Sequence, residues 1–365
     1  MKELHLGVEI AGLKLRNPVI PAAGPPVRNG EAILRCAQGG AGAIVTKTIS
    51  TKPADVPRPC MAKTKSGFLN TELWSELPPE QWIEKEYKIA RSAKLPMIVS
   101  LGYTPEQIGE LAPKVKNYAD ALELSTHYLG SDTKPMEEAI KVAKETGLPV
   151  IIKLSPNVPD IKMFASAAVR AGADAITAVN SFGPCFGVDI ETGIPYMGSR
   201  EFYGWLSGSA IKPIALRCVY DIVRTVDVPV IGVGGIETGN DAVEFIMTGA
   251  HAVGVCTAAI LYGPKVFGKI ASEIAAFMQR KGYSCVDEMR GVAIRNMKKL
   301  EFRTYPVPPK IDEEKCIGCG LCAMSCPYQA LSIVDKVAKV NIERCFGCGL
   351  CMSRCREVGV NAITF

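Results

Sequence analysis

Two cysteine runs near the end of the sequence decide how the chain is organised. The first reads Cys316-Ile-Gly-Cys-Gly-Leu-Cys-Ala-Met-Ser-Cys326-Pro, and the second reads Cys345-Phe-Gly-Cys-Gly-Leu-Cys-Met-Ser-Arg-Cys355. Each run has the spacing C-x2-C-x2-C-x3-C, in which three neighbouring thiolates bind one [4Fe–4S] cluster and the fourth binds the other cluster. We therefore predict two cluster sites, with the ligand sets Cys316, Cys319, Cys322 and Cys355, and Cys345, Cys348, Cys351 and Cys326.

A zinc ribbon is the alternative interpretation of these cysteines, because zinc sites also use C-x2-C pairs. Two matched runs of four cysteines favour iron–sulfur clusters. Such clusters transfer single electrons, so the rest of the chain should hold a group that uses electrons.

Length and composition leave room for one further large domain. The chain has 365 residues, and we expect a barrel domain over 1–300 and a ferredoxin domain over 301–365. The net charge of +5 is spread without basic runs, so no nucleic-acid partner is expected. The other six of the 14 cysteines are scattered, which fits a reducing cytoplasm. No signal peptide or membrane-spanning run is apparent in the sequence.

Apolar runs and amphipathic stretches alternate along the first domain. The predicted strands are 18–22, 43–48, 96–101, 120–125, 149–154, 174–179, 229–233 and 252–256. The predicted helices are 31–39, 79–94, 105–117, 135–146, 158–171, 209–225, 238–248 and 262–281. Eight strand–helix units indicate a (β/α)8 TIM barrel. A doubly wound sheet is disfavoured, because no dinucleotide-binding glycine pattern follows the first strand.

In a barrel of this kind, the loops after the strands carry the chemistry. The seventh strand is followed by Gly234-Gly235, and the eighth ends at Cys256-Thr257, where this fold commonly binds phosphate. We expect this phosphate to belong to FMN, which accepts a hydride and releases electrons singly to iron–sulfur clusters. Lys47 and Lys153 end two other strands, and their charges would stabilise a reduced flavin.

The strand-end motifs together resemble the dihydroorotate dehydrogenase family over about residues 5–280. The matching stretches include Asn17-Pro-Val with Ala22-Ala23-Gly24, Val45-Thr-Lys47-Thr, Leu69-Asn70, Asn180-Ser181 and Leu206-Ser207-Gly208. With its two-cluster module, the chain is similar to ferredoxin-fused catalytic subunits of bacterial NAD-dependent dihydropyrimidine dehydrogenases. The resemblance implies that FMN contacts Ala22, Ala23, Gly24, Lys47, Lys153, Asn180, Ser207, Gly208, Gly234, Gly235, Cys256 and Thr257, and that Asn70, Asn180 and Ser181 bind the substrate.

One loop departs from the family pattern. After the fourth strand the family carries Asn-x-Ser-Cys-Pro-Asn, whose cysteine is the acid/base, whereas this chain reads Glu123-Leu-Ser-Thr126-His127-Tyr128. Thr126 stands in the place of the cysteine, and a hydroxyl is a much poorer proton donor than a thiol. The proton donor is therefore open among Glu123, His127, Tyr128 and Cys185, the last of which lies in the segment 181–208. That segment is expected to be either a lid or a structural hairpin.

These features favour an FMN-dependent oxidoreductase that acts on a CH–CH bond or an activated C=C bond of a small unsaturated substrate. We expect its clusters to exchange electrons with a subunit that binds FAD and NAD(P)H, or with a ferredoxin. Family barrels are commonly dimers, so a homodimer or hetero-oligomer is expected. Two alternatives remain: a dihydroorotate dehydrogenase of pyrimidine synthesis, which the absent cysteine disfavours, and a non-catalytic electron-transfer subunit, which the retained lysines disfavour.

Overall fold

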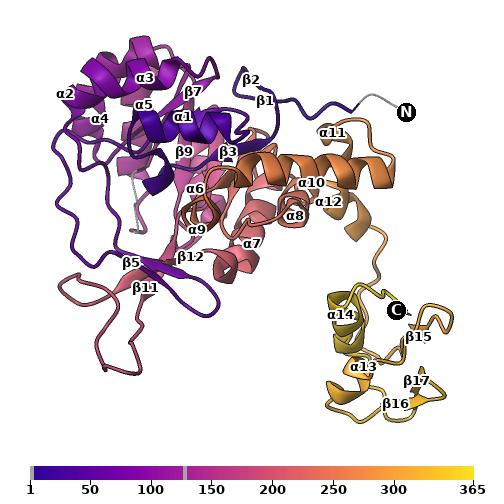
Figure 1. The fold of residues 1–365 in the computed structure, drawn as a ribbon. Helices are drawn as coiled ribbons and strands as arrows, with labels where there is room; N and C mark the ends of the chain where they lie inside the picture. Colours follow the sequence, from indigo (N-terminus) through magenta and orange to yellow (C-terminus); the bar gives the residue numbers. More distant parts are fainter. Residues whose placement is uncertain (1–3, 126–129) are drawn as a thin grey trace. The chain divides into compact units, whose positions relative to one another are not determined.

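The structure is a computed structural model that describes residues 4–125 and 130–365 (Figure 1). The chain divides into two compact units, Met1–Met297 and Lys298–Phe365. Each unit has its own cluster of buried apolar side chains. None of the helices in the described ranges has the length and apolar character that crossing a membrane requires.

The larger unit is built on eight parallel strands that follow one another around a barrel. The hydrogen-bonded order of the sheet is β3-β14-β13-β10-β9-β8-β7-β4. The Gly42 N–H donates to the Val19 carbonyl at 2.7 Å, which joins the first strand to the segment before the second. The predicted TIM-barrel class is confirmed. The strands are β3 (Val19–Pro21), β4 (Ile44–Val45), β7 (Met97–Leu101), β8 (Ala121–Leu124), β9 (Val150–Leu154), β10 (Ala175–Ala178), β13 (Val230–Val233) and β14 (Ala252–Val255).

Helices connect these strands and lie around the barrel (Figure 1). Several begin at side chains that cap their free N–H groups: Asn29 accepts from the Ala32 N–H at 2.8 Å, and Thr104 and Asp160 act in the same way. The helices are α1 (Gly30–Gln38), α2 (Pro79–Gln81) and α3 (Tyr87–Arg91) around a π-helical turn (Trp82–Glu86), α4 (Pro105–Val115), α5 (Lys134–Lys144), α6 (Ile161–Arg170), α7 (Lys212–Val223), α8 (Gly239–Thr248), α9 (Thr257–Tyr262), α10 (Val266–Lys281), α11 (Val286–Met289) and α12 (Val292–Met297).

The barrel interior is apolar with a polar layer inside it. All five residues of β7 and all five of β9 are buried, because the surrounding helices cover the strands from outside. Buried polar side chains on the strands β7, β8, β9 and β10 include Ser100, Glu123, Lys153 and Thr177. Burying such groups is costly unless they find partners, so each of them requires a structural or functional explanation.

A second, antiparallel sheet contributes side chains to the cavity at the carboxyl ends of the barrel strands, and the sequence analysis did not predict it. Its order is β11-β12-β6-β5, so segments about 140 residues apart pair directly, with Leu206 opposite Leu69. Part of the segment 181–208 therefore forms paired strands. The strands of this sheet are β5 (Met61–Lys63), β6 (Phe68–Asn70), β11 (Phe182–Cys185) and β12 (Gly204–Ser207). The larger unit also has an N-terminal hairpin of β1 (Val8–Ile10) and β2 (Leu13–Leu15).

The smaller unit contains two short helices and two pairs of strands. Each helix begins within one cysteine run, immediately after a glycine with a positive φ angle, Gly320 or Gly349. The helices are α13 (Leu321–Met324) and α14 (Leu350–Glu357), and the strand pairs are β15 (Lys310–Ile311) with β18 (Ile363–Thr364) and β16 (Leu331–Val334) with β17 (Val337–Val340).

Candidate functional site

A cavity of about 510 Å³ lies where the barrel strands end. Loops after the barrel strands line it, and the antiparallel sheet contributes further side chains. Most of the residues predicted from the sequence line this one cavity, although they come from widely separated parts of the chain. These are Ala22, Ala23, Gly24, Lys47, Asn70, Lys153, Asn180, Ser181, Ser207, Gly208, Gly234, Gly235, Cys256 and Thr257.

The loop after β13 forms a tight backbone turn at one part of this cavity. Gly234 has a φ angle of 128° and Gly235 one of 78°, a backbone region that disfavours other residues. A Cβ on Gly235 would lie 2.7 Å from the Lys212 Cβ and 2.9 Å from the Gly208 carbonyl oxygen. The N–H groups of Gly234 and Gly235 donate to no residue within 4–125 or 130–365. Free N–H groups in a narrow turn suit an anion such as a phosphate.

The N-terminus of the helix after this turn, α8, is already occupied by side chains of the protein. The N-terminus of α8 is closed by a capping box, in which Thr238 is the N-cap and Asp241 accepts from the Glu237 N–H at 3.1 Å and from the Thr238 N–H at 2.9 Å. Glu273 accepts from the Gly239 N–H at 2.6 Å. Two carboxylates thus already occupy this positive helix end, so an anion must be held by the glycine turn itself.

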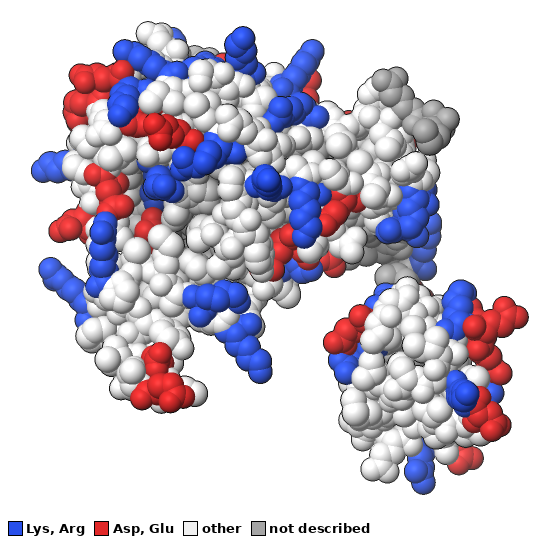
Figure 2. Space-filling model, in the orientation of Figure 1, with Lys and Arg blue, Asp and Glu red and all other residues white. Residues whose placement is uncertain are grey.

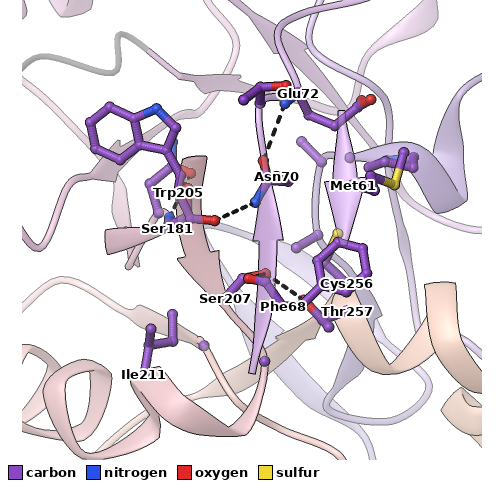
Figure 3. A pocket seen from close by; sticks show the side chains of 18 of the residues that line it. Met61, Phe68, Asn70, Glu72, Ser181, Trp205, Ser207, Ile211, Cys256 and Thr257 are labelled. Carbon is purple, nitrogen blue, oxygen red and sulfur yellow. Dashed lines mark hydrogen bonds between the residues drawn. The ribbon is translucent and has the colours of Figure 1, made fainter. Parts of the chain in front are cut away.

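On the neighbouring side of the cavity, β12 approaches α9. The Ser207 and Thr257 hydroxyl groups are hydrogen-bonded at 2.9 Å (Figure 3). Gly208 follows with a φ angle of 73°, and a Cβ there would lie 3.3 Å from the Thr257 Cγ2. These contacts place two hydroxyl groups and a glycine beside the turn of Gly234 and Gly235, which is a suitable environment for a phosphate and its sugar alcohol.

Lys153 is an unbalanced positive charge in the cavity. Only 7% of the residue is exposed, and its ammonium group has no hydrogen-bond or ion-pair partner in the described part of the chain. Burial raises the pKa of the adjacent Cys256 thiol, while the positive charges of Lys153 and Lys47 oppose that effect. A nearly buried ammonium group without a partner is costly, so the cavity is suited to a ligand that presents negative charge to Lys153.

Lys47, in contrast, is paired. Its Nζ lies 2.8 Å from Oε2 of Glu72, a cavity residue that sequence analysis missed. The thiol of Cys60 donates to the other carboxylate oxygen at 3.5 Å. Glu72 lies only two residues after Asn70, a residue that the resemblance implies in substrate binding, but its ion pair with Lys47 depends on tertiary structure.

Asn70 is fixed by the antiparallel sheet. Its Nδ2 donates to the Trp205 carbonyl at 3.0 Å, and its Oδ1 accepts from the Glu72 N–H at 3.3 Å (Figure 3). Asn180 is also constrained, because its Oδ1 accepts from the Ser181 N–H at 2.8 Å. An amide side chain can make about four hydrogen bonds, so Asn70 retains one donor and one acceptor for a ligand.

The candidate proton donors differ in their relation to the cavity. Glu123 was expected at a strand end, but it is the third residue of β8, is 2% exposed and does not line the cavity. Cys185 ends β11 and does not line the cavity either. Thr126, His127 and Tyr128 lie outside the described residues.

Tyr103 is a further cavity residue that the sequence analysis did not single out. It follows β7, and its ring contacts that of Trp74 edge-on, with the centroids 5.0 Å apart. Burial raises the pKa of its phenol to about 12, so the phenol stays protonated near neutral pH. It can therefore donate a hydrogen bond within the cavity.

The smaller unit contains two cavities, each lined by four cysteines. One is lined by Cys316, Cys319, Cys322 and Cys355. The other is lined by Cys326, Cys345, Cys348 and Cys351. In each set the fourth cysteine comes from the other run, as the spacing predicts. Backbone N–H groups donate to two of the first set, Ala338 to the Cys316 sulfur at 3.4 Å and Ala362 to the Cys355 sulfur at 3.2 Å, which is how proteins stabilise cluster thiolates.

Comparison with known proteins gives a family match for each of two parts of the chain. Residues 5–278 match the family described as dihydroorotate dehydrogenase. The chain belongs to the dihydroorotate dehydrogenase family. Residues 309–365 match a 4Fe-4S dicluster domain, so this family barrel is joined to an iron–sulfur module in one oxidoreductase.

Several archaeal relatives are named dihydroorotate dehydrogenase B (NAD(+)), catalytic subunit. The relative from Methanothermobacter thermautotrophicus is 39% identical over 301 residues, which cover 79% of this chain and 98% of the relative. The relative from Pyrococcus abyssi is 38% identical over 304 residues, covering 80% and 99%. These names favour the dihydroorotate dehydrogenase alternative over the dihydropyrimidine dehydrogenase-like function. Since the matched part is nearly the whole relative, the dicluster domain is additional to the part shared with them.

Proposed function

We propose that this chain is the catalytic component of an FMN-dependent iron–sulfur enzyme that oxidises or reduces a CH–CH bond beside a carbonyl group. The observation that carries the proposal is the presence, in one chain, of a family barrel whose cavity contains a free glycine turn and two four-cysteine cavities. The glycine turn fits a phosphate, and the cysteine sets fit clusters.

FMN would be held through its phosphate by the N–H groups of Gly234 and Gly235, with the Ser207 and Thr257 hydroxyl groups alongside. Lys153 would place its ammonium group beside the flavin ring, where negative charge collects on reduction. When bound, the flavin supplies two-electron hydride chemistry coupled to one-electron transfer. The protein's own contributions are to bind the substrate amides through Asn70 and Ser181, and to exclude water with the antiparallel sheet.

The two cysteine sets would hold two [4Fe–4S] clusters that carry electrons to or from a partner. Ile317 and Phe346 lie beside the cysteines and are 64% and 60% exposed, which gives the module apolar surface near both cavities. A subunit that binds FAD and NAD(P)H, or a ferredoxin, is the partner that we propose. The relatives' name, which includes NAD(+) and the term catalytic subunit, supports the first of these.

Two substrates are candidates. Dihydroorotate is the one that the relatives' name indicates. An uncharged ring amide, such as a dihydropyrimidine without a carboxylate, is favoured by one specific observation: Glu72 already neutralises Lys47 in the cavity.

The proposal can be tested on full-length protein purified without oxygen. We expect flavin released by denaturation to be FMN, and iron to total roughly eight atoms per chain. Dihydroorotate and dihydrouracil would then be mixed with the enzyme and an artificial acceptor, and flavin bleaching followed in the visible spectrum. A chain that binds no flavin, or contains zinc in place of iron, would refute the proposal. Intact cofactors that no CH–CH substrate reduces would favour the non-catalytic electron-transfer alternative.

A further inference from the structure

The ion pair between Lys47 and Glu72 changes the charge that the cavity offers to a substrate. The side chains are only 7% and 15% exposed, and their charged atoms lie 2.8 Å apart. Water screens a pair this sheltered much less than an exposed one. The positive charge of Lys47 is therefore already compensated before any ligand enters.

Glu72 is also held in place on its other side. The Cys60 thiol donates to the second carboxylate oxygen of Glu72 at 3.5 Å. The backbone N–H of Glu72 donates to Oδ1 of Asn70 at 3.3 Å (Figure 3). Both carboxylate oxygens thus have partners, and the backbone of Glu72 is tied to a proposed substrate-binding residue. The carboxylate has a defined position and cannot be displaced without breaking these contacts.

The remaining charges do not provide a surplus for an anionic substrate. The cavity is lined by three basic residues, Lys47, Lys153 and Arg200, and by three acidic ones, Glu72, Glu201 and Glu237, so the lining carries no net charge. A bound FMN phosphate would add roughly two negative charges. Lys153 is the buried cation without a partner in the described ranges, and it would face the flavin.

We propose that Glu72 determines substrate charge, so that the site selects a ring amide without a carboxylate and rejects anionic analogues of the same shape. The inference rests on the proposed function, because it assumes a flavin and a ring substrate in this cavity. A carboxylate near Lys47 would either face Glu72 directly or have to displace it, and both are unfavourable. An uncharged ring would use the free donor and acceptor of Asn70 instead.

The test uses FMN-loaded full-length protein and two ligand pairs that differ by a carboxylate, uracil with orotate and benzamide with benzoate. Binding is followed by the change in flavin absorbance, independently of turnover. In the wild type we expect each anion to bind at least about tenfold more weakly than its neutral partner. In Glu72→Gln we expect the ratio to shift by roughly tenfold towards the anion, because Lys47 is then uncompensated. Glu72→Asp, which retains the charge, should keep the wild-type preference.

Glu76→Gln is the matched control. It removes the same charge four residues along the chain, where Glu76 pairs with Arg58 outside the cavity lining, so the ligand ratios should not change. Wild-type protein that binds orotate as tightly as uracil would overturn the inference. The inference would also be overturned by Glu72→Gln protein whose anion-to-neutral binding ratios stay at the wild-type value, or that binds neither orotate nor benzoate. The flavin and iron contents of each preparation test the proposed function separately, since failure of the charge inference leaves them intact.

Discussion

The Thr177 hydroxyl donates a hydrogen bond to Oε2 of Glu123 at 2.8 Å inside the barrel. The Ser100 hydroxyl lies 3.5 Å from the other carboxylate oxygen and 2.8 Å from the Thr48 hydroxyl. Glu123 therefore joins hydroxyl groups from three other strand regions into one buried polar layer. Of these side chains, Thr48 lines the cavity and Glu123 does not.

This position leads to a prediction for Glu123. Glu123→Gln should keep the hydrogen bond from Thr177 and retain flavin and most of the turnover. Glu123→Ala should leave buried hydroxyl groups unpaired and lower the free energy of unfolding by about 2–3 kcal/mol, measured by urea denaturation. A Glu123→Gln protein with full flavin content but no turnover would instead identify Glu123 as a proton-transfer group.

The glycine turn after β13 gives a second prediction. Gly235→Ala combines backbone strain with a close contact to Lys212 and to the Gly208 carbonyl, so it should abolish FMN retention. Gly193→Ala is the control, because Gly193 also has a positive φ angle, 71°, but has no atom within 4 Å of an added Cβ. The control should cost only about 1 kcal/mol of stability and keep FMN. Equal loss of flavin in both variants would exclude a phosphate role for the turn.

Removing the charge of Lys153 should weaken flavin binding. We expect Lys153→Met to raise the dissociation constant of FMN by roughly tenfold, because the cavity then lacks its uncompensated cation. The fluorescence of released flavin measures this constant. Lys162→Met, on the exposed face of α6, removes the same charge away from the cavity and should have no effect. Unchanged FMN affinity in Lys153→Met would show that Lys153 makes no important contact with the cofactor.

Paired cysteine substitutions can test the exchange of the fourth ligands. Cys316 and Cys355 line the same cavity, so a Cys316→Ser/Cys355→Ser protein should keep one cluster, or roughly four irons. Cys316 and Cys326 line different cavities, so a Cys316→Ser/Cys326→Ser protein should lose both clusters. Iron analysis and the electron paramagnetic resonance of the reduced proteins give the count. The reverse result would mean that each run binds its own cluster with all four cysteines.

His251 should make the barrel less stable in mild acid. Burial first, and then the charge of Arg290, lower the pKa of His251 from 6.5 to about 4, and its Nδ1 accepts from the Val230 N–H at 3.3 Å. The unfolded chain therefore binds more protons between these values, so stability is complete above pH 6.5 and falls as the pH drops towards 4.

Urea unfolding at about pH 7.5 and about pH 5.5 should show a loss of about 1 kcal/mol that is absent in His251→Asn. The comparison with this variant is needed, because other groups also titrate over the range. An identical pH dependence in the two proteins would mean that His251 is not held neutral by the fold.

Charged side chains of both signs lie on the visible face of each unit. Figure 2 shows basic and acidic side chains interspersed over the larger unit, without a continuous basic region. On the smaller unit, charged side chains surround a broad uncharged area in this view.

Sequence patterns within single segments predicted the strands and helices of the barrel. The strands and helices of the barrel have the expected type and approximate bounds, because alternating apolar runs and capping residues such as Thr104 act within one segment. The antiparallel sheet was missed because β6 and β12 are three to four residues long and are held by pairing between Leu69 and Leu206, far apart in sequence. Glu123 lies inside both the predicted strand 120–125 and β8, so only the structure shows that its side chain is in the buried polar layer and does not line the cavity.

The sequence alone predicted the barrel class and the two cysteine sets, because both follow from patterns along the chain, and its family resemblance predicted the strand-end residues that line one cavity. Only the tertiary structure decided which charges are compensated. Lys47 and Lys153 look alike in sequence, yet one is paired with Glu72 and the other has no partner in the described ranges. The physical reason is that electrostatic compensation depends on distances of a few ångströms between side chains, and folding alone brings residues from different strands that close.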